Sequence, residues 1–207
     1  MHNLNLASFN APELQFSLIA SLLVGLCVLA VLFAVLIDFV EFQKRVGAKK
    51  ERKSMVETGS MLFFLLLFYF LLGSGFGRIS LSISSLKVSL VILGLIILIV
   101  GAFVNIKGRF DLGRNWANQI KIYNDHSLVI VGAYRLIRHP LYSSIIWMFF
   151  GASLVYLNYL ACLFNLLIFI PMMYCRAKQE ENLLSKEFPG YKDYQEKTGM
   201  FFPRLFK

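Results

Sequence analysis

Uncharged apolar runs alternate with charged segments along this chain. The first three runs cover residues 14–37, 58–77 and 88–106, and each is bounded by charged residues. A helix needs about 20 apolar residues to cross the hydrocarbon core of a bilayer, within a range of about 17–25. We therefore predict that each run forms one membrane-spanning helix, with the third ending near residue 106.

A fourth uncharged stretch, residues 140–175, is too long for a single crossing. As one helix it would measure roughly 54 Å at about 1.5 Å per residue, well beyond the thickness of the hydrocarbon core. The polar and aromatic segment 156–159 divides it and is typical of a turn at a membrane interface. The pattern thus predicts a C-terminal helical hairpin, and an all-α integral membrane protein of about five transmembrane helices.

Composition agrees with this class of protein, because 57% of the residues are hydrophobic and only 16% are charged. Soluble domains usually hold about 45–50% apolar and about 25% charged residues. The formal net charge of +9 comes from basic residues that cluster between the apolar runs. They do not form stripes interleaved with exposed aromatic residues, so we expect membrane lipids as partners and no nucleic acid.

The basic residues also predict an orientation. With the N-terminus outside, 19 of the 21 Lys and Arg residues fall on one side, and only Arg78 and Lys87 fall on the other. The positive-inside rule then predicts an N-out, C-in topology. The two longest polar segments, residues 107–139 and 176–207, would both face the cytoplasm, and any active site would lie there.

The segment Arg138-His139-Pro140 stands directly before the hairpin. Proline suits the first turn of a helix, where its missing N–H would be unpaired in any case. Arg138 and His139 would then lie at the membrane surface beside exposed N–H groups that favour an anion. An interfacial anchor at the level of the lipid headgroups explains the same residues, so both interpretations stay open.

Arg176 and Glu180 follow the last apolar residue and stand four residues apart, on one face of a helix. An exposed ion pair there would contribute only about 0.5 kcal/mol. Ionisable groups at the edge of a membrane, however, often mark a polar pocket. Glycine-rich phosphate loops, G-x-S-x-G elbows and H-E-x-x-H zinc motifs do not occur, and three histidines are too few to predict a metal site.

Taken in order, these pieces resemble a known family. The run His-x-Leu-x-x-x-Gly-x-Tyr-x-x-x-Arg-His-Pro-x-Tyr covers residues 126–142, and Arg-x-x-x-Glu-Glu follows the hairpin at residues 176–181. Together with the ending at residues 188–203, they resemble the isoprenylcysteine carboxyl methyltransferase family. The resemblance covers about residues 105–207. It implies two regions, the N-terminal transmembrane helices at 1–104 and a catalytic region at 105–207 with a cofactor loop, the hairpin and a cytoplasmic tail.

The resemblance implies S-adenosylmethionine as the methyl donor and a lipophilic small molecule or prenylated peptide as the substrate. By analogy, Arg176 and Glu180 would be catalytic and would border the reacting centre. A larger group would bind the cofactor: His126, Leu128, Gly132, Tyr134, Arg138, His139, Tyr142, Glu180 and Glu181.

The sequence departs from the family pattern at two places. Met200 stands where many relatives have arginine, so the contact of that arginine would be missing or moved to Arg204. Ser143 and Ser144 stand where glycine or alanine is common, which would alter the packing where the hairpin begins.

Three other functions compete with the carboxyl methyltransferase. A phospholipid or amine N-methyltransferase would use the same cofactor but would need a base such as His139. A sterol-reductase-like enzyme would use a nicotinamide cofactor and normally has more spans. A non-enzymatic membrane module would bind neither cofactor.

Overall fold

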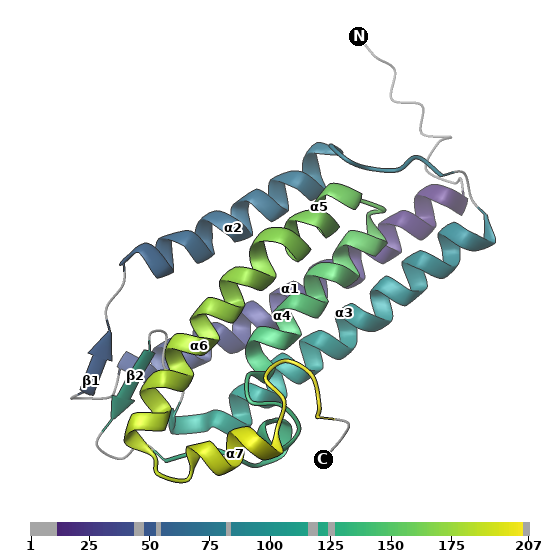
Figure 1. The fold of residues 1–207 in the computed structure, drawn as a ribbon. Helices are drawn as coiled ribbons and strands as arrows, with labels where there is room; N and C mark the ends of the chain where they lie inside the picture. Colours follow the sequence, from purple (N-terminus) through teal and green to yellow (C-terminus); the bar gives the residue numbers. More distant parts are fainter. Residues whose placement is uncertain are drawn as a thin grey trace.

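The structure, a computed structural model, describes residues 12–43, 48–52, 55–81, 84–115, 120–123 and 127–204. Within these ranges the chain folds into long helices that run side by side, with short elements gathered at one end (Figure 1). The helices are α1 (Pro12–Gln43), α2 (Met55–Ser74), α3 (Ser85–Leu112), α4 (Pro140–Val155), α5 (Tyr159–Phe164), α6 (Ile170–Glu187) and α7 (Tyr191–Lys197). Short 3-10 turns lie at Gly113–Asn115 and Gly132–Arg135, and a π-helical turn, Asn165–Phe169, joins α5 to α6.

Among the described residues, three helical stretches are long and apolar enough to cross a membrane. They are Leu14–Asp38, Ser85–Leu112 and Tyr159–Glu187, the last of which combines α5, the π-helical turn and α6. Phe63–Ser74 and Pro140–Val155 are shorter apolar helices. The predicted class, an all-α integral membrane protein, is confirmed.

The predicted hairpin is present and its turn lies at the predicted place. Helix α4 ends at Val155 and α5 begins at Tyr159. The buried Asn158 side chain accepts a hydrogen bond from the backbone N–H of Ala161 at 2.9 Å and donates to the carbonyls of Leu71 and Phe76. This one side chain therefore caps α5 and fastens the turn to the end of α2.

Helix α3 is longer than its apolar run. It begins at Ser85, because the Ser84 side chain caps its first turn by accepting from the backbone N–H of Lys87, and it continues past residue 106 to Leu112. Charged residues at a membrane surface do not end a helix, so hydropathy alone underestimated its length. The added turn places Asn105 and Arg109 on one face of the same helix.

A short antiparallel sheet was not predicted. Strand β1 (Ala48–Arg52) pairs with β2 (Ile120–Tyr123) and joins the segment after α1 to the segment after α3. Strand β1 is rich in charged residues and β2 is only four residues long, so neither offers the longer alternation of apolar and polar residues that marks a strand. The sheet lies at the same end of the molecule as α7 (Figure 1).

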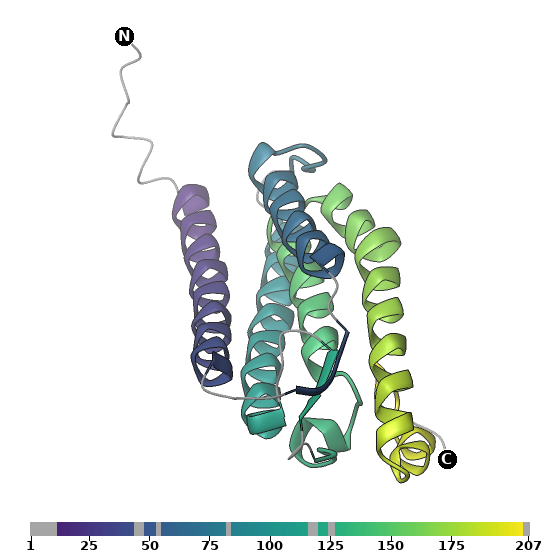
Figure 2. The same ribbon diagram turned by 90° about the vertical axis from the view of Figure 1, so that its left-hand side faces the viewer.

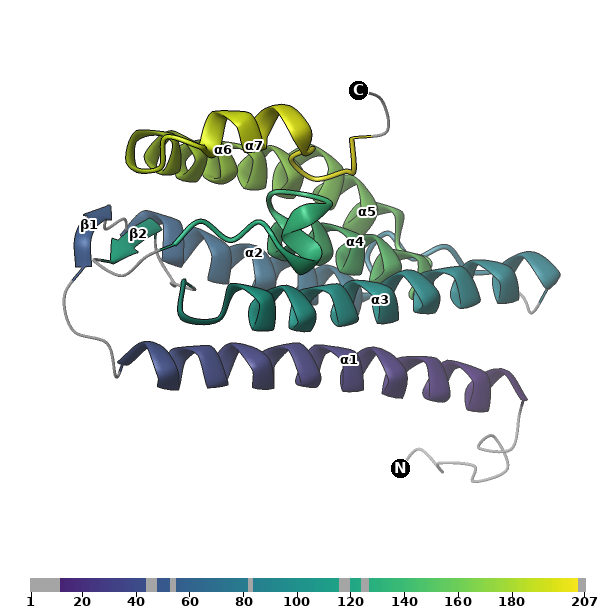
Figure 3. The same cartoon turned by 90° about the horizontal axis from the view of Figure 1, so that it is seen from below.

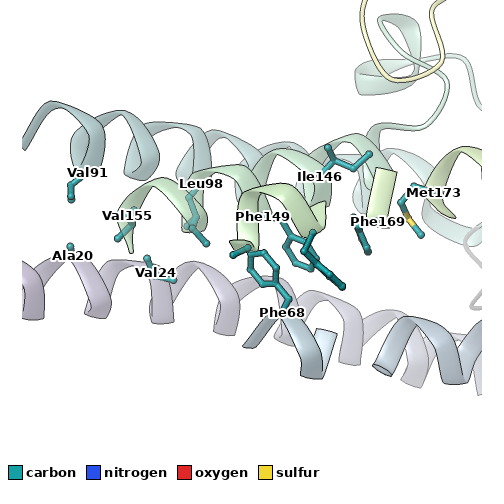
Figure 4. Packing of buried hydrophobic residues seen from close by; sticks show 13 residues of the cluster. Ala20, Val24, Phe68, Val91, Leu98, Ile146, Phe149, Val155, Phe169 and Met173 are labelled. Carbon is teal, nitrogen blue, oxygen red and sulfur yellow. The ribbon is translucent and has the colours of Figure 1, made fainter. Parts of the chain in front are cut away.

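The helices pack in layers. Figures 2 and 3 both show α1 as an outer layer beside α3, with α6 on the opposite side of the molecule. In the core, the rings of Phe68 on α2 and Phe149 on α4 stack with their centroids 4.0 Å apart (Figure 4). Helices α3 and α4 approach closely at Gly94 and Gly151, where a Cβ atom added to Gly94 would lie 2.6 Å from the carbonyl oxygen of Gly151. Small residues allow this close approach inside a membrane.

Candidate active site

Polar side chains gather where α4 begins. Pro140 is the first residue of α4, as predicted, and the preceding His139 is buried. The segment after α7 lies against this turn, because the backbone N–H groups of Arg138 and His139 donate to the carbonyls of Gly199 and Met200 at 2.9 and 3.1 Å. The end of the described chain therefore covers the start of α4.

Glu181 on α6 is the central acceptor of the cluster, and its side chain is only 2% exposed. Its Oε1 accepts from Arg138 Nε at 2.7 Å and lies 3.3 Å from His139 Nε2. Its Oε2 accepts from Gln195 Nε2 on α7 at 3.0 Å and lies 3.7 Å from Lys178 Nζ. A buried charge is costly unless it is paired in this way. Glu181 thus holds together the loop before α4, α6 and α7.

Arg138 completes this arrangement. Besides its bond to Glu181, its Nη1 donates to the carbonyl oxygen of Gln195 at 3.1 Å and to that of Thr198. The guanidinium therefore fixes both ends of the last turn of α7. Its Nε and Nη1 donors are thus engaged by other groups of the protein.

Tyr142, Arg176 and Glu180 form a second, more accessible group. The Tyr142 hydroxyl donates to Glu180 Oε2 at 3.0 Å, and the hydroxyl oxygen of Tyr142 itself accepts from Arg176 Nε at 3.1 Å. The Glu180 side chain is 35% exposed, and its Oε2 lies 3.7 Å from His139 Nδ1. The rings of His139 and Tyr142 stack with an interplanar angle of 9°. The hydroxyl thus places one cation and one accessible anion side by side.

The loop before α4 is attached to α3. Gly132 has a φ of 58°, and a Cβ atom there would lie 2.1 Å from an oxygen of the Asp111 carboxylate. Asp111 accepts from the backbone N–H of Ala133 at 2.8 Å and pairs with Lys107 at 2.9 Å. The structure therefore explains the glycine by backbone conformation and close packing against α3.

Burial favours the neutral form of the tyrosines around this loop and α7 by raising the pKa of their hydroxyl groups. It raises the pKa of Tyr134 well above its ordinary value, and the nearby Glu180 charge adds to the effect. Burial likewise raises the pKa of Tyr194 to about 12. Neutral phenols can donate hydrogen bonds, and the Tyr194 hydroxyl does so to the carbonyl oxygen of Tyr134.

The structure brings most of the predicted site residues together. The gathered residues are Arg138, His139, Tyr142, Arg176, Glu180 and Glu181. Tyr134 lies beside them, and its carbonyl accepts a hydrogen bond from Tyr194 on α7. Gly132 lies against α3, and Leu128 is a partly buried residue earlier in the same loop. His126 falls outside the described residues. The catalytic and cofactor-binding roles of this set stay predictions.

The two departures from the family pattern have specific surroundings. Met200 contributes its backbone carbonyl to His139, a contact that any side chain at this position would allow, while Arg204 donates to the carbonyl of Glu196. Ser143 donates its hydroxyl to the carbonyl of Phe201 at 2.8 Å, and Ser144 accepts from Asn105 Nδ2.

Sequence reasoning missed Gln195, Thr198 and Asn105 as members of the polar cluster and its surroundings. Their partners lie between 14 and 60 residues away, so no local spacing indicated them. Among the described residues, no group of three or more His, Cys, Asp and Glu side chains is arranged to hold a metal ion.

The fold and the site together define a helical membrane protein with a charged, partly accessible cluster at one end of its helices. Residues 91–186 match the isoprenylcysteine carboxyl methyltransferase (ICMT) family, which confirms the resemblance predicted from the sequence. The matched segment holds all the gathered site residues, from Tyr134 to Glu181, whereas α7 and the covering segment lie beyond it.

A curated relative is the nickel-cobalt-cadmium resistance protein NccN of Alcaligenes xylosoxydans xylosoxydans. It is 34% identical over 95 residues, which are 45% of this chain and 45% of the relative. The similarity thus spans less than half the length of that protein.

Proposed function

We propose that this protein transfers the methyl group of S-adenosylmethionine to a lipophilic acceptor, with a carboxylate of the isoprenylcysteine type as the acceptor class. One observation carries the proposal: the Tyr142 hydroxyl joins Arg176 to Glu180 inside the segment that matches the ICMT family. The chemistry belongs, on this proposal, to the region 105–207 and faces the cytoplasm, where the positive-inside rule places most basic residues.

The residues present suit a cationic methyl donor. Glu180 offers an accessible carboxylate to an ammonium group, while the Glu181 carboxylate is already engaged by Arg138, His139 and Gln195. We therefore assign cofactor contact to Glu180, with His139 and Tyr142 beside it. Glu181 holds these groups in place. When bound, S-adenosylmethionine supplies a methyl group on a positively charged sulfur.

Arg176 suits the acceptor. A guanidinium can hold a carboxylate through two parallel N–H···O bonds, and the bond from Arg176 Nε to Tyr142 fixes the direction of this group. A carboxylate acceptor is already a nucleophile and needs no general base. Positioning and exclusion of water then account for the acceleration.

The length of α4 gives the two substrates separate routes. Its 16 residues span about 24 Å, less than the hydrocarbon thickness of about 30 Å. With the hairpin turn at the outer membrane surface, the first turn of α4 lies within the apolar layer, just short of its cytoplasmic surface. A lipophilic acceptor then approaches Arg176 from the lipid, and the polar methyl donor approaches Glu180 from the water.

The direct test is a binding measurement on the purified full chain. We expect saturable binding of S-adenosylmethionine in the micromolar range and transfer of a labelled methyl group into a native lipid extract. The label should be released by mild base, as expected for a methyl ester. Base-stable label would indicate an N-methylated product instead, and failure to bind, or binding of NADPH alone, would reject the methyltransferase.

A further inference from the structure

A second polar network lies next to the site and is buried between α1, α3 and α4. Arg109 on α3 donates from Nη1 to Asp38 Oδ2 on α1 at 2.6 Å and from Nε to Asn105 Oδ1 at 2.9 Å. Asn105 Nδ2 then donates to Ser144 Oγ at 2.8 Å and approaches the carbonyl oxygen of Leu141 at 3.4 Å. The network therefore runs from the end of α1 to the first turns of α4.

These groups are well buried. Asn105 is 0% exposed and Ser144 is 2% exposed, and the Arg109 side chain is 10% exposed. Charged and amide groups within membrane helices are costly, and they are typically retained where they serve a function. Because the helices also pack through apolar and small residues, packing alone gives no reason to place a charged group here.

The network ends on both sides of Tyr142. Leu141 and Ser144 belong to the same helical turn, so holding them fixes the direction in which the Tyr142 side chain leaves α4. The hydroxyl of that side chain contacts Arg176 and Glu180. Enzymes depend on such directions closely, because a displacement of about 1 Å can cost about a hundredfold in rate.

We infer that Asn105 and Arg109 are positioning residues, which orient Tyr142 toward Arg176 and Glu180 by way of Ser144 and couple this orientation to α1 through Asp38. The catalytic part of the inference rests on the proposed methyltransferase function. The link to α1 extends it, because Asp38 lies outside the segment 91–186 that matches the ICMT family.

Two buried serines of α4 provide a matched pair for the test. Ser144 and Ser153 both donate to a backbone carbonyl of their own helix at 2.8 Å. Ser144 also accepts the hydrogen bond from Asn105, whereas Ser153 lies near the other end of α4, away from this network. Ser144→Ala and Ser153→Ala therefore remove the same group at equal burial, and only the first variant interrupts the network.

The first measurement is hydrogen–deuterium exchange of the backbone of residues 139–145 in the full chain without substrates. We expect Ser144→Ala and Asn105→Ala to raise the exchange rate about tenfold, and Ser153→Ala to leave it within about twofold of the wild type. Asp38→Asn should raise it as well. Equal exchange in the Ser144→Ala and Ser153→Ala proteins would overturn the inference, and Ser144→Ala keeps the test valid if Asn105→Ala does not fold.

The second measurement is methyl transfer by the same proteins. We expect kcat to fall about tenfold in Ser144→Ala and Asn105→Ala, with the acceptor KM within about twofold, since the lipophilic body of the acceptor binds elsewhere. Faster exchange with an unchanged kcat would show a purely structural network and overturn the positioning role. If the wild type binds no S-adenosylmethionine, the proposed function fails, and the exchange data alone decide whether the network orients α4.

Discussion

Tyr142 and Glu180 are joined by a hydrogen bond of 3.0 Å across the two arms of the hairpin, although 38 residues separate them in sequence. The same hydroxyl accepts from Arg176, so one phenol sets the distance between the accessible anion and the cation of the site. The sequence indicated that Arg176 and Glu180 share a helix face. The structure adds the group that lies between them.

Removing this hydroxyl should impair methyl transfer more than stability. Tyr142→Phe keeps the ring that stacks on His139 but loses both hydrogen bonds. Hydrogen bonds to charged groups are worth about 1.5–3 kcal/mol, so we expect kcat/KM to fall about tenfold to a hundredfold. Tyr156→Phe at the other end of α4 is the control and should retain wild-type activity. Equal kinetics in the two variants would refute the bridging role.

The two adjacent glutamates should respond differently to the same substitution. Glu181→Gln leaves the buried Arg138 without its counter-charge, which should cost about 3 kcal/mol or more and lower the melting temperature in detergent. Glu180→Gln changes a partly exposed side chain, so its effect on stability should stay within about 0.5 kcal/mol. The affinity of the Glu180→Gln protein for S-adenosylmethionine should instead fall about tenfold, the size expected for the loss of a charge-assisted contact. The reverse pattern would exchange the roles assigned to these residues.

Close packing of α3 on α4 predicts a strong effect of a single methyl group. Gly94→Ala would bring a Cβ atom to 2.6 Å from the backbone of Gly151, so the helices must separate. Such overpacking typically costs about 1–3 kcal/mol. Outside its own helical turns, no heavy atom of the described residues lies within 4 Å of a Cβ atom added to Gly25 in α1, so Gly25→Ala should be neutral or stabilising by up to about 1 kcal/mol. Thermal unfolding of both variants compares them directly.

Orientation in the membrane is a further prediction. The distribution of Lys and Arg places the C-terminal segment in the cytoplasm and the loop containing Arg78 and Lys87 outside. A reporter that works only in the cytoplasm should therefore be active when it is fused after Lys207. The same reporter inserted between Arg78 and Lys87 should be inactive. Reversed signals would place the site on the outer face.

Much of the fold was predictable because hydropathy is a local property. The apolar runs located α1, α2, α3 and the hairpin, and the polar aromatic segment 156–159 marked the turn. The helix ends were less accurate. Glycines with positive φ at Gly75 and Gly77 follow the end of α2 within its apolar run, and α3 continues through charged residues. Hydropathy does not record either effect.

The sequence by itself determined the membrane class, the hairpin and the residue types of the site, since these depend on composition and on short spacings. Only the tertiary structure decided which of those residues share a partner. It separated Glu181, enclosed by Arg138, His139 and Gln195, from the accessible Glu180. It also paired Asp38 with Arg109 across 71 positions. Such contacts form only when whole helices pack, because helix packing sets the distances between these side chains. No local pattern in the sequence encodes those distances.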